Sequence, residues 1–286
     1  MKLIATPSNP RLALVLVDLE ARTVTPIEST PDQAVRPWRD HAVPAHRPFG
    51  ITWDDETLYV TNRHHLLTFD RSLRYRGVVC RELCDNPHQI ACHGGHLYVA
   101  SPSHGVMMLE GPRFAHATVV VPLGQEHHCN SLQFQDDRAY VLLHNLARRP
   151  SEILVFDREW RQVGRVDTGA MCAHNLCREA DGLTTLDTDG TRGLLRDDGM
   201  SIVLAPERSR FLRGLAVNDE YYIAGVSPRT ERIYRGHGTS VLKTICRRTK
   251  QIVDEMSLPE IGAINDLRLI DTVDAAHNVA PFWTAH

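Results

Sequence analysis

Short runs of alternating apolar and polar residues, separated by turns rich in Gly, Asp, Asn and Pro, follow one another along the whole chain. One unit has apolar strands over 50–53, 58–61 and 66–70, with an acidic turn at 54–55 and a fourth strand close behind. Apolar residues at helical spacing are nearly absent. Because runs of this length bounded by turn-forming residues are typical of strands, the pattern predicts an all-β protein.

The four-strand unit recurs at a nearly constant interval. An apolar residue marks the first strand of each unit, and successive anchors are 39, 42, 44, 39 and 52 residues apart. The anchors are Ile51, Ile90, Leu132, Leu176, Leu215 and Leu267. Four strands in about 40 residues is the length of one β-propeller blade. The spacing therefore predicts a ring of blades.

The two ends of the chain complete each other. The sixth unit contains only its first strand, within residues 263–271, whereas residues 1–28 supply three strands without a partner. Joining them makes one blade from both ends and removes free sheet edges. We therefore predict a single domain, 1–286, with the all-β fold of a six-bladed β-propeller closed by this shared blade. Two β-sandwiches are the alternative, but no linker-like change in composition divides the chain.

Two segments lie outside the repeats. The Pro-rich stretch 29–48 is long for a blade connection, so it is either a lid or a plain surface loop. The tail 272–286 contains Phe282 and Trp283, which we expect to dock on the body or on a second subunit. Homo-oligomerisation therefore stays open.

Composition narrows the class of protein. With 42% hydrophobic and 23% charged residues, the chain is an ordinary globular one. The net charge of −3 argues against a nucleic-acid partner. No apolar run reaches the roughly 18 residues of a membrane helix, and the N-terminus lacks a secretory signal. Seven cysteines without a disulfide framework suggest the cytoplasm.

The blade model gives the 16 histidines a common location. In a propeller, the residues just before each anchor surround one mouth of the axial channel, and the loops after the second strands lie on the same face. Most histidines fall at these positions, while the opposite turns carry ordinary turn residues. Turns need Gly, Asn or Asp rather than His. The convergence predicts a functional pocket at this mouth, although each single His has a packed, hydrogen-bonded side chain as its alternative.

The residue types at the mouth predict metal-assisted chemistry. Imidazole suits Zn, Fe or Cu, whereas Asn and Asp oxygens suit Ca, so the divalent metal is not identified. We predict its ligands among His88, His128, Asn130, His174, Asn175 and Asp266. A second set of side chains would act on the substrate, with His104 and His144 as candidate general bases and Arg213 holding an anionic group.

Cys129, Cys172 and Cys177 are close in sequence to this ring. A Cys beside a His is a nucleophile in some enzymes. Thiols with apolar neighbours usually pack in the core instead, and we favour that interpretation for all three.

The blade pattern and its closure by both chain ends resemble the six-bladed propellers of the gluconolactonase, senescence-marker and strictosidine-synthase group. This resemblance implies an axial divalent cation, held by Glu, Asn and Asp, and hydrolysis of lactones or esters. Asn130, Asn175 and Asp266 are the matching positions. Phe49 and Gly50 occupy the position where the group has its Glu. With the additional His88 and His174, the axial ring is also similar, more distantly, to that of metal oxygenases built on seven-bladed propellers.

Three functions follow from these patterns. The leading hypothesis is a metal-dependent enzyme that acts on a small organic molecule in the axial pocket, most simply a lactonase-like or esterase-like hydrolase. A His-ligated iron or copper oxidoreductase is the second. A non-catalytic propeller that binds a protein or peptide is the third. Fold alone does not choose among them.

Overall fold

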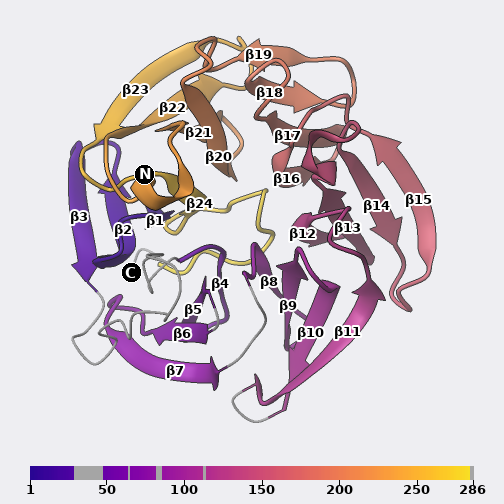
Figure 1. Ribbon diagram of the computed structural model, residues 1–286. Coiled ribbons are helices and arrows are strands. Elements are labelled where there is room, and N and C mark those ends of the chain that lie inside the picture. The colour runs from indigo at the N-terminus through magenta and orange to yellow at the C-terminus, as the bar shows by residue number, and fades with distance from the viewer. Residues whose placement is uncertain (29–47, 64, 82–85, 112–113, 284–286) are drawn as a thin grey trace.

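The computed structural model describes residues 1–28, 48–63, 65–81, 86–111 and 114–283. Six four-stranded antiparallel sheets stand around a central axis in it, each with its first strand innermost (Figure 1). This confirms the six-bladed β-propeller. All six predicted anchors lie on innermost strands and are at most 3% exposed.

Three complete blades follow the N-terminal strands. Blade 1 consists of β4 (Ile51–Trp53), β5 (Leu58–Asn62), β6 (His65–Phe69) and β7 (Tyr75–Arg81). Blade 2 consists of β8 (Ile90–His93), β9 (His96–Ser101), β10 (Gly105–Glu110) and β11 (His116–Pro122). Blade 3 consists of β12 (Cys129–Gln135), β13 (Arg138–Leu143), β14 (Glu152–Phe156) and β15 (Gln162–Asp167).

Two more blades and the closing blade complete the ring. Blade 4 consists of β16 (His174–Glu179), β17 (Gly182–Asp187), β18 (Gly193–Arg196) and β19 (Ser201–Val203). Blade 5 consists of β20 (Arg210–Val217), β21 (Tyr221–Pro228), β22 (Ser240–Cys246) and β23 (Ile252–Leu258). The closing blade joins β24 (Ile264–Leu269) to β1 (Lys2–Pro7), β2 (Leu12–Asp18) and β3 (Thr23–Glu28), as the sequence predicts.

Apolar side chains fill the spaces between neighbouring blades rather than one central core. Blade 5 and the closing blade, for example, share a buried cluster that includes Leu3, Ile223 and Leu267. Each inter-blade layer removes apolar surface from water at about 25 cal/mol per Å². Because the axis itself stays polar, the inter-blade layers hold the ring together while the centre is left for polar side chains.

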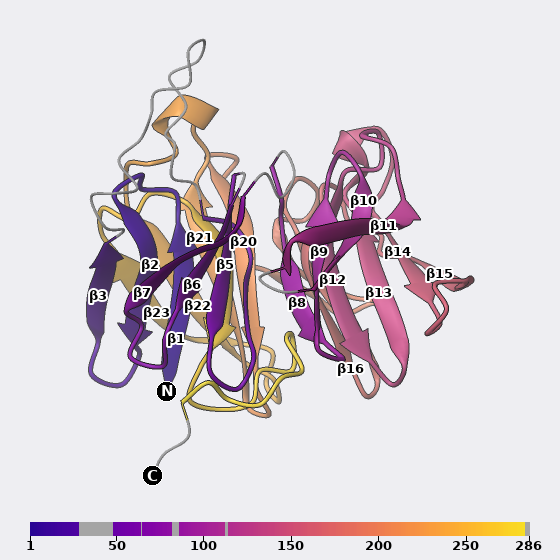
Figure 2. The same cartoon turned by 90° about the horizontal axis from the view of Figure 1, so that it is seen from below.

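The face that carries the channel mouth also carries two short 3-10 helices, η3 (Asn145–Ala147) and η4 (Arg232–Tyr234). Figure 2 shows η4 on the side of the disc away from the chain termini. The predicted lid, 29–48, falls outside the described residues except for Pro48. Within the described residues, we find no helix with the length and apolar character needed to cross a membrane.

The C-terminal segment closes the other end of the channel. The yellow chain crosses beneath the inner strands in Figures 1 and 2. Asp274 accepts hydrogen bonds from the backbone N–H groups of Val217, Leu269 and Ala276 at 3.0 Å each. Phe282 is 1% exposed, and the Trp283 Nε1 donates to the carbonyl of Arg71. The predicted docking of the tail on the body is confirmed for Phe282 and Trp283.

Candidate functional site

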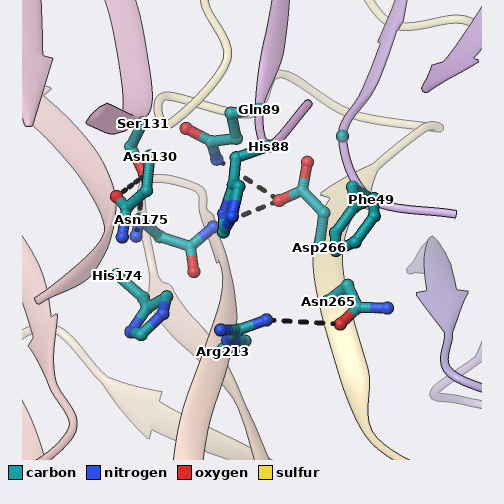
Figure 3. A pocket seen from close by; sticks show the side chains of 11 residues that line it. Phe49, His88, Gln89, Asn130, Ser131, His174, Asn175, Arg213, Asn265 and Asp266 are labelled. Atoms are coloured by element: carbon teal, nitrogen blue, oxygen red, sulfur yellow. Dashed lines mark hydrogen bonds between the residues drawn. The ribbon is translucent and has the colours of Figure 1, made fainter. Parts of the chain in front are cut away.

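The open mouth of the channel leads into a small polar cavity, which we call the axial site (Figure 3). Its volume is about 20 Å³, enough for about one water molecule. The lining comes from the beginnings of the innermost strands and the residues just before them. These residues are Phe49, Gly50, His88, Gln89, Asn130, Ser131, His174, Asn175, Arg213, Asn265 and Asp266.

Local backbone irregularities turn the lining inward. The pairing of β12 shifts register between Cys129 and Ser131, and that of β16 shifts between His174 and Leu176. A similar shift in β20 falls between Leu212 and Leu215. Such β-bulges release a residue from the ladder and redirect its side chain. The sequence shows the residues, but only the bulges explain why adjacent side chains share one cavity.

The side-chain oxygen atoms of Asp266, Asn175 and Asn130 accept hydrogen bonds, which for Asp266 and Asn175 come from other blades. Asp266 Oδ1 accepts from Asn175 Nδ2 at 3.1 Å and from Gln89 Nε2 at 3.3 Å, and Oδ2 accepts from the N–H of Ile51. Asn175 Oδ1 accepts from the N–H of Gly214 at 2.8 Å. Asn130 Oδ1 accepts from Ser131 Oγ. Asp266 and Asn175 therefore connect several blades at the axis.

Gly50 lies where blades 1 and 2 approach each other closely. A Cβ atom at this position would lie 2.6 Å from the carbonyl oxygen of His88 and 2.6 Å from the N–H nitrogen of Ile90. Both neighbours are backbone atoms of blade 2, so they cannot rotate aside. Blades 1 and 2 approach too closely here for any side chain.

Four imidazole rings form a continuous series above the cavity, which we call the histidine arc. Ring centroids are 5.1 Å apart for His88 and His128, 5.0 Å for His128 and His144, and 4.9 Å for His144 and His174. Phe49 stacks on the His88 end at 5.5 Å. Residues from blades 2, 3 and 4 meet in the arc, so distant stretches of sequence make one surface.

The proton position on His174 is set by a neighbour. The Thr188 hydroxyl donates its only hydrogen to the carbonyl of Leu212 at 3.0 Å. It can therefore only accept from His174 Nδ1, which lies 3.0 Å away. His174 then carries its proton on Nδ1 and a bare lone pair on Nε2. This Nε2 atom is buried and has no hydrogen-bond partner among the described residues.

His144 has the opposite arrangement. Its Nδ1 accepts a hydrogen bond from the N–H of Leu146 at 3.2 Å, so the neutral ring carries its proton on Nε2. Burial, with the neighbouring His128 and Arg213, lowers the pKa of His144 to about 3. The arc thus pairs an imidazole that accepts a proton with one that donates a hydrogen bond.

Arg213 supplies the permanent positive charge of the axial site. Its Nη1 lies 3.4 Å from Asn265 Oδ1, and its guanidinium lies 5.5 Å from the centre of the Phe211 ring. Burial, followed by the charge of Arg213, lowers the pKa of His174 well below its usual value. The carboxylate of Asp266 pairs with Arg268 at 3.1 Å beneath the cavity. The site thus has a guanidinium group near its histidines and a paired carboxylate beneath the cavity.

The structure brings most of the predicted site residues together. His88, Asn130, His174, Asn175, Arg213 and Asp266 line the cavity, and His128 and His144 join through the arc. His104 is different: it is exposed, and its Nδ1 lies 3.1 Å from Ser101 Oγ in its own turn. Sequence reasoning did not select Thr188, because Thr in a loop has no distinguishing signal until its partners are known.

The candidate metal ligands are spread over several blades. Among the residues that the structure describes, no group of three or more His, Cys, Asp or Glu side chains is placed to hold a metal ion. Two of the three ring contacts in the arc are edge to face and the third is tilted by 56°. The oxygens of Asn175 and Asp266 accept hydrogen bonds. His174 Nε2 is the donor atom best prepared for a metal. The divalent metal predicted from the sequence therefore stays a prediction.

The cysteines near the ring pack in the core, as we favoured. Burial raises the pKa of Cys129 to about 12 and that of Cys177 well above its usual value. Cys172 is also buried, and its pKa is raised. A thiol of this kind holds its proton at neutral pH and is a poor nucleophile.

No family model and no curated protein sequence matches the chain. Solved structures share its fold. A chain of a nidogen–laminin complex superposes with a TM-score of 0.67 at 11% identity, covering 93% of this chain and 97% of that one. A Bacteroides caccae protein of unknown function gives 0.63 at 9% identity, with 93% and 97% covered. Streptogramin B lyase gives 0.52 at 12% identity, with 80% and 89% covered.

The two tautomers are directly measurable. In ¹⁵N long-range correlation spectra, we expect His174 to be protonated on Nδ1 and His144 on Nε2. Both rings should stay neutral at pH 6, because burial and Arg213 lower their pKa values. Thr188→Val should remove the preference at His174 and leave that at His144. A His174 ring that is protonated on Nε2, or charged at pH 6, would contradict the assignment.

Proposed function

We propose that the axial site is the active site of an enzyme that hydrolyses a small ester or lactone carrying an anionic group. The bare, buried Nε2 of His174 beside the guanidinium of Arg213 carries the proposal. A polar atom buried without a partner costs about 1–3 kcal/mol. A ligand or water that donates to this nitrogen would recover that cost.

The reaction uses the shape of the cavity. The cavity of the axial site has room for about one water molecule, which would donate a hydrogen bond to His174 Nε2. As the water oxygen forms its bond to the substrate carbonyl carbon, its proton moves to His174 Nε2. We assign to His144, whose neutral ring carries its proton on Nε2, the role of donating a hydrogen bond to the oxyanion that develops. The carbon–oxygen ester bond then breaks, and His174 returns the proton to the leaving alkoxide.

Binding of a negatively charged substrate would raise the pKa of His174 and so make it a stronger base. In the empty site, burial and Arg213 hold the pKa of His174 so low that it is a weak base. An anionic group on Arg213 offsets that positive charge, and an opposite charge nearby raises the pKa of an imidazole. The same contact that binds the substrate therefore raises the basicity of His174. Neutral analogues would lose both effects.

The sequence also predicts a metal-dependent enzyme and a non-catalytic binding protein. The divalent metal predicted from the sequence remains a prediction, and no step above uses one. The named structural neighbours include both a lyase and a protein of a binding complex, so the fold does not choose between catalysis and binding. A purely structural channel does not require a buried imidazole nitrogen without a hydrogen-bond partner among the described residues, such as Nε2 of His174. This atom therefore favours a catalytic over a purely structural role for the axial site.

The test is a hydrolysis screen with the full chain. Small esters and lactones, each paired with an analogue lacking its carboxylate, are followed by proton release. We expect turnover only of the carboxylate-bearing members. Arg213→Gln should raise their KM at least about tenfold, as expected for loss of a charge-assisted contact, whereas Arg148→Gln, an exposed position on the same face, should not.

Each assay is repeated with chelator and after adding Ca²⁺, Zn²⁺, Fe²⁺ or Cu²⁺. Activity that is unaffected by chelator supports the imidazole mechanism. Loss of activity in chelator that one metal restores would replace it with the metal-dependent mechanism. No turnover of any pair would contradict the hydrolase.

A further inference from the structure

A second cavity opens on the opposite face of the disc, between blades 2 and 3. We call it the aromatic groove. Its volume of 390 Å³ is in the range of small-molecule pockets. Turns at the far ends of the inner and third strands form it, so it does not share residues with the axial site. Its lining is His93, Gly94, His96, Tyr98, Phe134, Asp137, Arg138, Ala139, Asp157, Arg158 and Trp160.

Aromatic rings make the floor of the groove. His93 stacks flat on Phe134, with centroids 4.3 Å apart and an angle of 3° between the rings. Tyr98 and Trp160 complete the floor, and their ring centroids lie 4.7 Å and 5.9 Å from that of Phe134. Burial lowers the pKa of His93, so its ring is neutral near pH 7. The exposed face of His93 continues the stack toward solvent.

Trp160 is not required by the turn that carries it. In the 157–161 turn, the N–H of Trp160 bonds the carbonyl of Asp157, and Trp160 has a left-handed φ of 60°. The corresponding turns of blades 1 and 4 have the same bonds and place Leu73 and Gly199 at this position. A large aromatic side chain is unusual in this conformation. Its presence here therefore reflects the groove rather than the turn.

The charges on the rim leave one cation. Asp137 pairs with Arg158, and Asp157 pairs with Arg161 at 2.7 Å. Arg138 lies exposed at the groove and makes no ion pair with any residue that the structure describes. Arg161 also pairs with Glu159 at 3.1 Å. Of the two arginines that line the groove, Arg138 is therefore the one left to contact a ligand, beside the aromatic floor. A ligand that complements it has one flat apolar ring and one negative group.

We propose that the aromatic groove binds a small aromatic carboxylate. Its ring would lie on the floor made by His93, Phe134 and Trp160, where stacked or edge-on ring contacts are favourable. Its carboxylate would accept two parallel hydrogen bonds from the Arg138 guanidinium, whose planar geometry matches it. This site is independent of the function proposed for the axial site.

Calorimetric titration of the full chain with indole-3-acetate, and with its uncharged analogue indole-3-acetamide, tests the proposal. We expect the acid to bind at least about tenfold more tightly than the amide, as for a charge-assisted contact worth ~1.4 kcal/mol. Arg138→Gln should abolish this difference. Arg248→Gln, which removes an exposed charge from the same face in blade 5, should preserve it.

The floor is tested with Trp160→Leu, because Leu73 occupies the same turn position in blade 1 and the fold accommodates it. Both ligands should bind at least about fivefold more weakly to this variant, whose fold is checked by thermal denaturation. Arg213→Gln should leave groove binding unchanged. Equal binding of acid and amide, absence of binding, or loss of binding in Arg213→Gln would each overturn the proposal.

Discussion

Replacement of His174 by Gln is expected to lower kcat for hydrolysis by about 10²–10⁴-fold, the usual contribution of a general base. Gln retains a polar side chain of similar size, so Thr188 keeps a hydrogen-bond partner, but it cannot accept a proton from water. The KM of a carboxylate-bearing substrate should change little, because Arg213 is intact. Initial rates over a range of substrate concentrations separate the two parameters.

The pH profile makes this prediction specific. A base must be unprotonated, so activity rises with pH through its pKa in the free enzyme. Because burial and Arg213 hold the pKa of His174 well below 6.5, kcat/KM should stay flat as the pH falls through 6.5. His116→Gln, at an exposed imidazole on β11, is the control and should retain full activity. Folded His174→Gln protein with unchanged kcat would contradict the role of His174.

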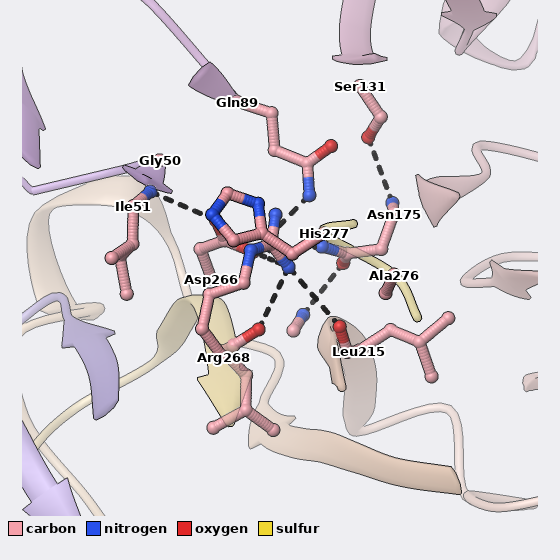
Figure 4. Close-up of polar contacts among 12 residues, drawn as sticks. Gly50, Ile51, Gln89, Ser131, Asn175, Leu215, Asp266, Arg268, Ala276 and His277 are labelled. Atoms are coloured by element: carbon pink, nitrogen blue, oxygen red, sulfur yellow. Dashed lines mark hydrogen bonds and ion pairs between the residues drawn. The ribbon is translucent and has the colours of Figure 1, made fainter. Parts of the chain in front are cut away.

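The second large effect concerns stability. Arg268 is 1% exposed and pairs with the equally buried Asp266 beneath the axial site (Figure 4). Its Nη1 also donates to the carbonyls of Leu215 and Leu267. Removing one partner of a buried pair leaves an uncompensated charge and costs about 3–5 kcal/mol. We therefore expect Arg268→Met to lower the free energy of unfolding by about this amount, measured by urea denaturation.

An exposed pair provides the matched control. Arg22 and Asp254 lie 2.9 Å apart with side chains 51% and 40% exposed. Solvent screens such a pair, so Arg22→Met should cost at most ~1 kcal/mol. A similar decrease in the free energy of unfolding in both variants would contradict a larger contribution from the buried pair.

The cost of Arg268→Met should also depend on pH. Burial raises the pKa of Asp266, and Arg268 opposes this increase. Without Arg268 the folded-state pKa rises further above the unfolded value of 3.8. The folded variant then binds a proton that the unfolded chain releases, so its stability increases as the pH falls. The difference in the free energy of unfolding between Arg268→Met and the parent protein should therefore become smaller as the pH falls toward 4.

Much of the fold could be predicted from the local pattern of apolar residues and turns. The anchors from Ile51 to Leu267 mark innermost strands because each blade buries one apolar residue at the same place against its neighbour. The closing blade was predictable because the three N-terminal strands and β24 each lacked partners. The docking of Phe282 followed from its apolar character, although the route of the tail beneath the channel did not.

The roles of the axial residues were less accessible. Asn175 and Asp266 have the chemistry of metal ligands, but hydrogen bonds from Gln89 and Gly214 engage their oxygens. His104 occupies a loop on the correct face, yet it is exposed and bonds within its own turn. Spacing places a residue on a face, whereas the direction of its side chain depends on bulges and on atoms from other blades.

The sequence by itself determined the six-bladed ring, its closure and the gathering of histidines at one mouth, because repeated apolar anchors and turns are local properties. The tertiary structure alone decided which imidazole nitrogen is bare. The proton on His174 depends on Thr188, and the Thr188 proton depends on the carbonyl of Leu212 in the next blade. Such a chain of donors and acceptors exists only after blades 4 and 5 have packed together.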